Sequence, residues 1–480
     1  MVAAFTFLGV RVWDSERGAP LHIWHTYVPR ELSAKELDAA GWKQYLEAEA
    51  RIFDDLRQQV SQHLAPDERA PVNRYFVGSP VYPAHFAQDW NRSYTLEPDG
   101  VPAGAAVLLH GLTDSPYSLR HIARLYRDHG FVVIAIRLPG HGTVPGALTE
   151  IDWETWEAAT RLAVREARRR IEPSAPLHLV GFSLGGALAL RYALDSIDGK
   201  KLSRPDRLVL ITPMVGITRW ARIAGLAALP ALLPPFEKAA WLSVMPEFNP
   251  FKYNSFPVNG ARQSVRIADA LQEQLTRYAR EGKLVKLPPI LTFQSVVDFT
   301  VSTKAIVSAL YRRLPSNGSE LVLFDVNRSV KFGQLLRSSA DIALSRILPA
   351  APQNYRTTII TNSDSGTNEV SERVIEAGTG AATSRSLGLS FPPGVFSLSH
   401  VALPFPMNDS LYGLYPDPSE DFGIHLGALA PRGERNVLIV SMDMLLRISF
   451  NPFFPYMLGR IEEGITGRSS NATAGEALPR

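Results

Sequence analysis

The chain has 480 residues, of which 45% are hydrophobic and 20% charged, and its formal net charge is +3. These proportions are typical of a folded globular protein with more than one domain-sized unit, and the lack of a basic stripe argues against nucleic-acid binding. The absence of cysteine excludes disulfides, thiolate catalysis and cysteine-ligated zinc, and we expect neither a metal nor another cofactor.

The N-terminal stretch 2–10 is apolar but short. No run in the sequence reaches the roughly 18 apolar residues that a membrane-spanning helix needs. The stretch has no basic segment before it and no clear small-residue cleavage site after it, so we expect a first strand or a docked terminus and favour a cytoplasmic protein. The alternative is a truncated membrane anchor or an export signal, with peripheral membrane association through the N-terminus. The sequence carries no signal of an oligomeric state.

Residues 1–100 are predicted to form an N-terminal extension that packs on the core, with a helical pattern over 31–64. Across 101–212, apolar strand patterns then alternate with helical patterns. The predicted strands are 105–110, 131–137, 177–180 and 207–212, and the predicted helices are 118–129, 152–170 and 184–195. This alternation is typical of an α/β fold with a mostly parallel, doubly wound sheet.

Residues 213–262 interrupt the alternation, because seven prolines lie there among Trp, Phe and Leu residues. We expect an inserted cap or lid in this segment. The core pattern resumes over 263–326. It consists of predicted helices at 262–282 and 304–313 and predicted strands at 289–296 and 320–326.

A second irregular segment follows at 327–395, rich in Ser, Thr, Asn and Gly, and we predict a second insertion there. A helix is expected at 331–347, and β-rich stretches at 356–361 and 369–376 predict a small hairpin excursion.

The last part of the chain, 396–468, is predicted to hold a functional loop around His400 and a C-terminal helix. The helical pattern covers 436–449 and would pack on the core. The composition of 469–480 predicts a loose tail.

The most informative motif is Gly-x-Ser-x-Gly at 181–185, centred on Ser183. An apolar strand pattern precedes it and a small-residue helical pattern follows, which is the order that a nucleophile elbow requires. Gly181 and Gly185 allow the close approach of the neighbouring strand and helix. The motif therefore predicts that Ser183 is a nucleophile.

A nucleophilic serine needs a general base, and the base needs an acid that orients it; in this arrangement the chain order is Ser, then Asp or Glu, then His. Only His400 and His425 follow Ser183. We predict that His400, just after a strand-like segment, is the base, with a structural loop histidine as the alternative. His425 is expected to be a surface residue or one that supports the site.

The orienting acid is expected directly after a core strand, and Asp298 follows the apolar run at 289–296. An N-cap for the next helix is the alternative role for Asp298, because aspartate is a favoured capping residue. Asp325, at the end of the next predicted strand, is the reserve candidate.

An oxyanion hole needs two backbone donors, one after the nucleophile and one from an earlier loop. The N–H groups of Leu184 and Leu112 are predicted to supply them, with Gly111 allowing a tight turn. His110 precedes the nucleophile, so we expect it to tie down this loop through a hydrogen bond rather than to act as the base.

These residues together resemble the α/β-hydrolase fold. The motifs that carry the resemblance are His110-Gly111-Leu112, Arg137-Leu138-Pro139-Gly140-His141-Gly142, the elbow at Ser183, Asp298 and His400. The Pro-Gly-His-Gly loop followed by Trp153 and Trp156 is similar to the carboxylesterase and monoglyceride-lipase-like branch, which also includes serine-aminopeptidase-like members. The resemblance covers about 105–300 and implies that His141 is structural, near the site entrance.

Two features depart from that family. Its histidine usually follows the acid closely, whereas 102 positions separate Asp298 from His400 in this chain. We attribute the distance to an insertion at 327–395. Residues 1–100 have no family counterpart that the sequence identifies.

Taken together, these motifs predict a lipase-like serine carboxylesterase. We expect it to hydrolyse small-molecule esters that have a hydrophobic acyl or aryl part, through an acyl-enzyme intermediate. A thioesterase, amidase or serine peptidase of the same fold is the alternative, and a non-catalytic binding protein is a further one. A dinucleotide-binding protein is disfavoured, because the glycine-rich turn has Ser183 at its apex and is not Gly-x-Gly-x-x-Gly.

Overall fold

The computed structural model describes residues 19–199, 201–216, 234–329, 336–338, 342–429 and 441–467. Several of the predicted features lie outside these ranges. They are the apolar stretch 2–10, the tail 469–480, the part of the predicted cap at 217–233, and parts of the predicted helices at 331–347 and 436–449.

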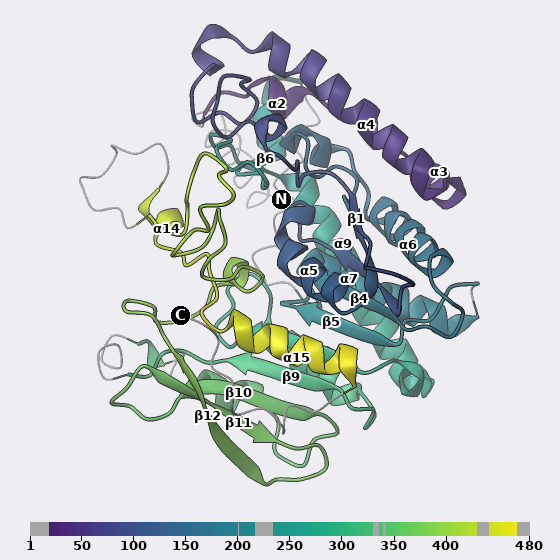
Figure 1. The fold of residues 1–480 in the computed structure, drawn as a ribbon, viewed down its shortest axis with the longest axis vertical. Coiled ribbons are helices and arrows are strands. Elements are labelled where there is room, and N and C mark those ends of the chain that lie inside the picture. The colour runs from purple at the N-terminus through teal and green to yellow at the C-terminus, as the bar shows by residue number, and fades with distance from the viewer. Residues whose placement is uncertain are drawn as a thin grey trace, which may run out of the picture.

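A ten-stranded sheet forms the centre of the molecule, in the order β1-β3-β2-β4-β5-β8-β9-β10-β11-β12 (Figure 1). The strands from β3 to β10 in this order are parallel, while β1, β11 and β12 pair antiparallel at the edges. Their bounds are β1 (Tyr94–Leu96), β2 (Gly104–Leu109), β3 (Phe131–Ile136), β4 (Leu177–Phe182), β5 (Arg207–Ile211), β8 (Ile290–Ser295), β9 (Glu320–Phe324), β10 (Arg356–Asn362), β11 (Glu369–Ile375) and β12 (Ala382–Ser390). The predicted α/β fold with a mostly parallel sheet is confirmed.

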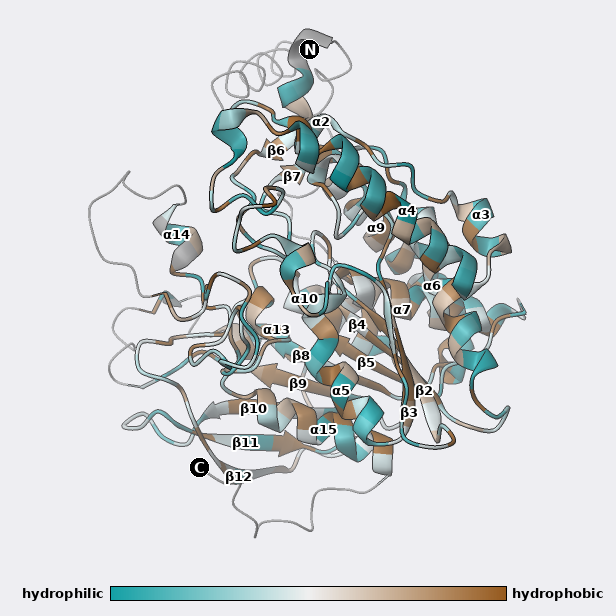
Figure 2. Ribbon diagram, turned by 45° about the horizontal axis from the view of Figure 1, so that its top comes forward, coloured by the Kyte–Doolittle hydropathy of each residue, from teal (hydrophilic) through white to brown (hydrophobic). Residues whose placement is uncertain are grey.

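Helices cover both faces of this sheet, and alternate residues of each central strand point to opposite faces. Val107 on β2 belongs to the core cluster under α6, α7 and α9, whereas Leu108 belongs to the cluster under α5 and α15. Figure 2 shows the central strands as the most hydrophobic part of the ribbon. Continuous apolar runs form these strands because both faces are buried.

The helices are mostly those that the periodic patterns predict. Their bounds are α2 (Ile23–Thr26), α3 (Ala34–Ala39), α4 (Trp42–Gln59), α5 (Arg120–Asp128), α6 (Trp153–Arg169), α7 (Leu184–Asp195), α9 (Val258–Arg280), α10 (Thr303–Ala305), α13 (Ala343–Ile347), α14 (Met442–Leu445) and α15 (Phe454–Thr466). A two-stranded sheet pairs β6 (Trp241–Ser243) with β7 (Phe256–Pro257). Within the described ranges, no helix has the length and apolar character needed to cross a membrane.

The segment before β1 packs on the core through a buried ionic cluster. The guanidinium of Arg137, just after β3, is fully buried and binds Glu31 at 2.7 Å and Glu49 at 3.1 Å. Tyr45 on α4 donates a hydrogen bond to the carbonyl of Arg137. Because a buried guanidinium needs such partners, α4 is attached to the core next to the 137–142 loop.

The β-rich stretches at 356–361 and 369–376 form the predicted hairpin, because β10 and β11 pair antiparallel. The hairpin is not a separate excursion, since β10 pairs parallel with β9, and β11 and β12 extend the same sheet beyond it. The helical expectations also need correction: of 436–449, the described part has only the short α14, and the C-terminal helix is α15. The predicted helix at 304–313 is divided into α10, a π-helical turn at Ile306–Leu310 and a 3-10 turn at Tyr311–Arg313.

Candidate active site

Ser183 occupies the sharp turn between β4 and α7, where its backbone adopts φ 53° and ψ −110°. A non-glycine residue rarely takes a positive φ, so the turn holds Ser183 in a strained conformation. Steric crowding requires glycine on both sides of Ser183, because a Cβ on Gly185 would lie 1.9 Å from the carbonyl oxygen of Leu109. On Gly181 it would lie 2.3 Å from the carbonyl oxygen of Gly185. The predicted elbow geometry is present.

Asp298 lies three residues after β8, and each of its two carboxylate oxygens has two hydrogen-bond partners. Its Oδ1 accepts from the N–H groups of Thr300 and Val301 at 2.7 and 2.9 Å. Its Oδ2 lies 2.9 Å from Nδ1 of His400 and accepts from the amide of Gln294 at 3.1 Å. Asp298 thus lies in the histidine-orienting position, while the N-cap of α10 is Ser302, whose side chain accepts from the N–H of Ala305. The alternative role of Asp298 as the cap of the next helix is therefore wrong.

The electrostatic surroundings keep Asp298 ionised. Burial alone would raise the pKa of its carboxyl group, but the charge and hydrogen bond of His400 and the two backbone N–H groups lower it further, so that the net pKa lies below the usual range. A carboxylate in this position fixes the imidazole with Nδ1 protonated and Nε2 free to accept a proton.

His400 begins a short 3-10 helix, His400–Ala402, and its ring lies 5.5 Å from the ring of Phe182, the neighbour of Ser183. Two hydrogen bonds attach the preceding segment to the sheet: Ser295 donates to the carbonyl of Leu398 at 2.9 Å, and Asn327 donates to that of Phe396 at 2.8 Å. Among the described residues no hydrogen bond joins Ser183 to His400. Such bonds often tighten only when substrate is bound.

The loop after β2 lies against the elbow. Gly185 donates its N–H to the carbonyl of His110 at 3.1 Å, and Leu138 donates to Nε2 of His110 at 3.0 Å. Burial lowers the pKa of His110 well below its usual value, so the ring is neutral and holds the loop through hydrogen bonds. Within the described chain, the N–H groups of Leu112 and Leu184 donate to no protein acceptor.

Residues of the 234–262 segment hold the same loop from its other side. Thr113 has φ 65°, and its carbonyl accepts a hydrogen bond from the N–H of Tyr253 at 2.9 Å. The neighbouring Asp114 is buried and lies 3.3 Å from the ammonium of Lys252. Sequence reasoning missed Lys252 and Tyr253, because no local motif marks them.

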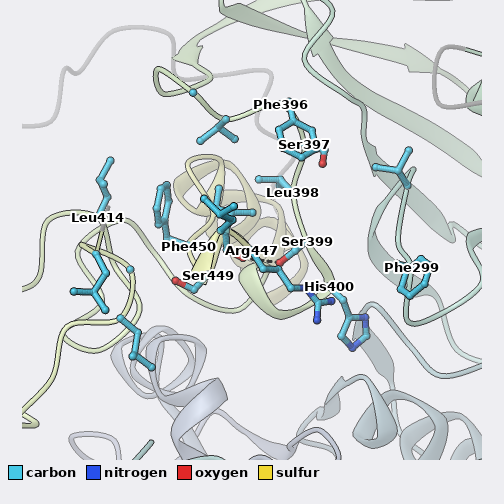
Figure 3. A pocket seen from close by; sticks show the side chains of 18 of the residues that line it. Phe299, Phe396, Ser397, Leu398, Ser399, His400, Leu414, Arg447, Ser449 and Phe450 are labelled. Atoms are coloured by element: carbon cyan, nitrogen blue, oxygen red, sulfur yellow. Dashed lines mark hydrogen bonds between the residues drawn. The ribbon is translucent and has the colours of Figure 1, made fainter. Parts of the chain in front are cut away.

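Two cavities lie near the segment that begins at His400: His400 lines the first and Val401 the second. One of about 570 Å³ is lined by His400 and by apolar side chains such as Phe299 and Phe396 (Figure 3). The second, of about 210 Å³, is lined by Asp114, Lys252 and several aromatic residues. The two share Leu426, Arg447 and Ser449, whereas Ser183 lines neither of them.

The remaining candidates lie in other surroundings. His425 bonds through Nδ1 to the carbonyl of Ser410 at 2.9 Å, and Asp325 is held by Arg328 at 2.8 Å. His141 is fully buried, and burial lowers its pKa to about 3, as expected for a structural, neutral histidine. The part of the chain that the structure describes contains no cluster of three His, Asp or Glu side chains able to hold a metal ion.

Comparison with known proteins gives matches over the core. A family model described as "Alpha/beta hydrolase family" matches residues 106–352. A thermostable monoacylglycerol lipase from Bacillus sp. (strain H-257) is 32% identical over 92 residues, which make up 19% of this chain and 35% of that protein. The chain therefore matches about a third of the length of this relative.

Solved structures match over about half of the chain. A structure described under "LipS and LipT, two metagenome-derived lipolytic enzymes" has 20% identity and a TM-score of 0.39, covering 54% of this chain and 97% of that one. A monoacylglycerol lipase from Paleococcus ferrophilus has 17% identity and a TM-score of 0.36, covering 53% and 98%. A monoglyceride lipase from Saccharomyces cerevisiae has 15% identity and a TM-score of 0.35, covering 48% and 81%.

Proposed function

Since the chain belongs to the alpha/beta hydrolase family, we propose that it is a serine carboxylesterase, lipase-like, acting on esters with a hydrophobic acyl or aryl part. The observation that carries the proposal is the pairing of a strained serine with an acid-bound histidine. Ser183 sits at φ 53° between β4 and α7, and Nδ1 of His400 lies 2.9 Å from Oδ2 of Asp298. A base oriented in this way next to an elbow serine serves nucleophilic acyl transfer.

In the proposed reaction, Oγ of Ser183 attacks the ester carbonyl while Nε2 of His400 accepts its proton. Asp298 keeps the imidazole in the required tautomer and stabilises the imidazolium that forms. The N–H groups of Leu112 and Leu184 have no acceptor in the part of the chain that the structure describes, and they are proposed to bind the oxyanion. His400 then gives its proton to the leaving alcohol, and a water molecule activated by the same histidine releases the acid.

The surroundings of His400 support an ester with a large apolar part. The walls of the 570 Å³ cavity are mostly aliphatic and aromatic, a lining typical of sites for apolar ligands. A thioesterase, amidase or serine peptidase would use the same chemistry with another leaving group, so the relative rates on esters, thioesters and amides distinguish these activities.

The test is hydrolysis of 4-nitrophenyl esters from acetate to decanoate, beside an acyl thioester and aminoacyl 4-nitroanilides. The proposal predicts that the esters are the best substrates and that Ser183→Ala abolishes turnover. The matched control is Ser345→Ala, because Ser345 is an exposed serine on α13. Faster cleavage of the anilides would indicate an amidase or peptidase, and faster cleavage of the thioester would indicate a thioesterase. If no substrate is turned over, the esterase proposal is wrong and a non-catalytic binding protein is the remaining alternative.

A further inference from the structure

The charged side chains around the two cavities are not equally neutralised. Three of them line the cavities besides His400: Asp114, Lys252 and Arg447. The ammonium of Lys252 lies 3.3 Å from the carboxylate of Asp114, so these two charges compensate each other. Arg447 is the remaining charge, and it lines both cavities.

Arg447 has no carboxylate partner among the described residues. Its one hydrogen bond there is donated by Nη2 to the hydroxyl of Thr300 at 3.1 Å. The charge of the nearby Asp298 acts on Arg447, but among the described residues the two form no hydrogen bond, and the oxygens of Asp298 already accept four others, one of them from His400. Within the described chain, the guanidinium therefore keeps most of its five donors available in the lining of both cavities.

Figure 3 shows Arg447 beside His400 at one end of the larger cavity. A group bound by this guanidinium would therefore lie close to the atoms that react. Much of the remaining lining of this cavity is apolar and exposed. Eleven large hydrophobic side chains of the described chain are exposed, and four of them line this one cavity: Phe299 (84%), Leu446 (67%), Phe396 (55%) and Leu429 (47%).

We propose that the substrates are half-esters, in which a short apolar chain joins the reacting ester to a free carboxylate that pairs with Arg447. The inference rests on the proposed esterase function and narrows its substrate class. A guanidinium binds a carboxylate through two parallel N–H···O bonds, and Arg447, which forms no ion pair among the described residues, has the donors for one such carboxylate. The apolar rim then receives the uncharged part of the ester.

The test compares two esters of equal chain length, mono-(4-nitrophenyl) adipate and 4-nitrophenyl hexanoate, with the Ser183→Ala rate subtracted as background. The readout is the ratio of kcat/KM for the charged ester to that for the neutral one. Arg447→Met should lower this ratio about tenfold or more, mainly through KM, because a charge-assisted hydrogen bond is lost. Arg447→Lys should retain part of the preference, since it keeps the charge but not the fork.

The matched control is Arg280→Met, because Arg280 is an exposed arginine at the far end of α9 and should leave the ratio unchanged. Added salt should reduce the wild-type ratio but not that of Arg447→Met. If both esters are hydrolysed through Ser183 and Arg447→Met leaves the ratio unchanged, the half-ester inference is wrong while the esterase proposal stands. If wild type hydrolyses neither ester faster than Ser183→Ala, both are wrong.

Discussion

Replacing Asp298 by asparagine disturbs the proposed proton relay with almost no change in side-chain shape. In the wild type, Oδ1 of Asp298 accepts hydrogen bonds from the N–H groups of Thr300 and Val301. The carboxamide oxygen of the new residue is expected to take that position, because two N–H donors require an acceptor. Its NH₂ group then replaces Oδ2 and faces Nδ1 of His400, which lies 2.9 Å away in the wild type.

A donor at that place forces Nδ1 of His400 to accept a hydrogen bond, so the ring proton moves to Nε2. In this tautomer His400 can no longer take the proton of Ser183, and the charge that stabilises the imidazolium is also lost. The expected fall in kcat is about 10⁴-fold, or about 5 kcal/mol in activation free energy. The fold should tolerate the change, since Oε1 of the neighbouring Gln294 is buried and accepts no hydrogen bond from the described residues, so an amide flip would let it accept from the new NH₂.

The assay is the rate of 4-nitrophenyl butyrate hydrolysis at saturating substrate, together with the thermal unfolding midpoint of each variant. Asp325→Asn is the matched control, because the side chain of Asp325 is as little exposed as that of Asp298 but is held by Arg328 rather than by His400. That control should keep kcat within an order of magnitude of wild type. The reasoning would be refuted if Asp298→Asn kept more than a tenth of the wild-type kcat, or if Asp325→Asn were the more damaging change.

Three further changes test separate parts of the account. His400→Ala should reduce kcat by more than about 10³-fold and His425→Ala by less than tenfold; the reverse order in ester turnover would identify His425 as the base. Gly185→Ala places a Cβ 1.9 Å from a backbone oxygen, so the free energy of unfolding measured in urea should fall by more than about 3 kcal/mol. A variant as stable as wild type would contradict the close packing at the elbow. Asp409→Asn should lower the free energy of unfolding at neutral pH by about 3 kcal/mol, because it leaves the buried Arg120 without its closest partner. Burial raises the pKa of Asp409, but Arg120 and the other donors lower it further, and the net pKa is below its usual value. The stabilisation is therefore present above the unfolded-state pKa near about 4 and is lost as pH falls towards the folded-state pKa, so the gap between wild type and variant should narrow in acid. A gap that is independent of pH would contradict this assignment.

The parts of the molecule that sequence predicts well are those with a local cause. The strands β2, β3, β4, β5, β8 and β9 are mainly apolar runs, and the elbow needs its glycines within two residues of Ser183. The relation of Asp298 to β8 is equally local, because it follows the strand by three residues. Each of these features is encoded in a window of about ten residues.

The features that sequence reasoning missed depend on contacts between distant segments. The sequence predicts the hairpin of β10 and β11 but not its place in the main sheet, because nothing local shows that β10 would pair with β9 or that β12 would follow β11. That pairing explains how the chain can run through three added strands after β9 and still return at His400 to the end of β8. Arg447 and Lys252 lie 149 and 46 positions from Asp298, and only the folded chain brings them to cavities at the same site.

The central claim is that Ser183 is the nucleophile of a serine hydrolase. The most direct measurement is mass spectrometry of the protein after reaction with a fluorophosphonate, with the modified peptide sequenced. The account predicts a single adduct on Ser183, and no labelling of a folded Ser183→Ala variant. An adduct on another residue, or equal labelling of wild type and variant, would contradict it.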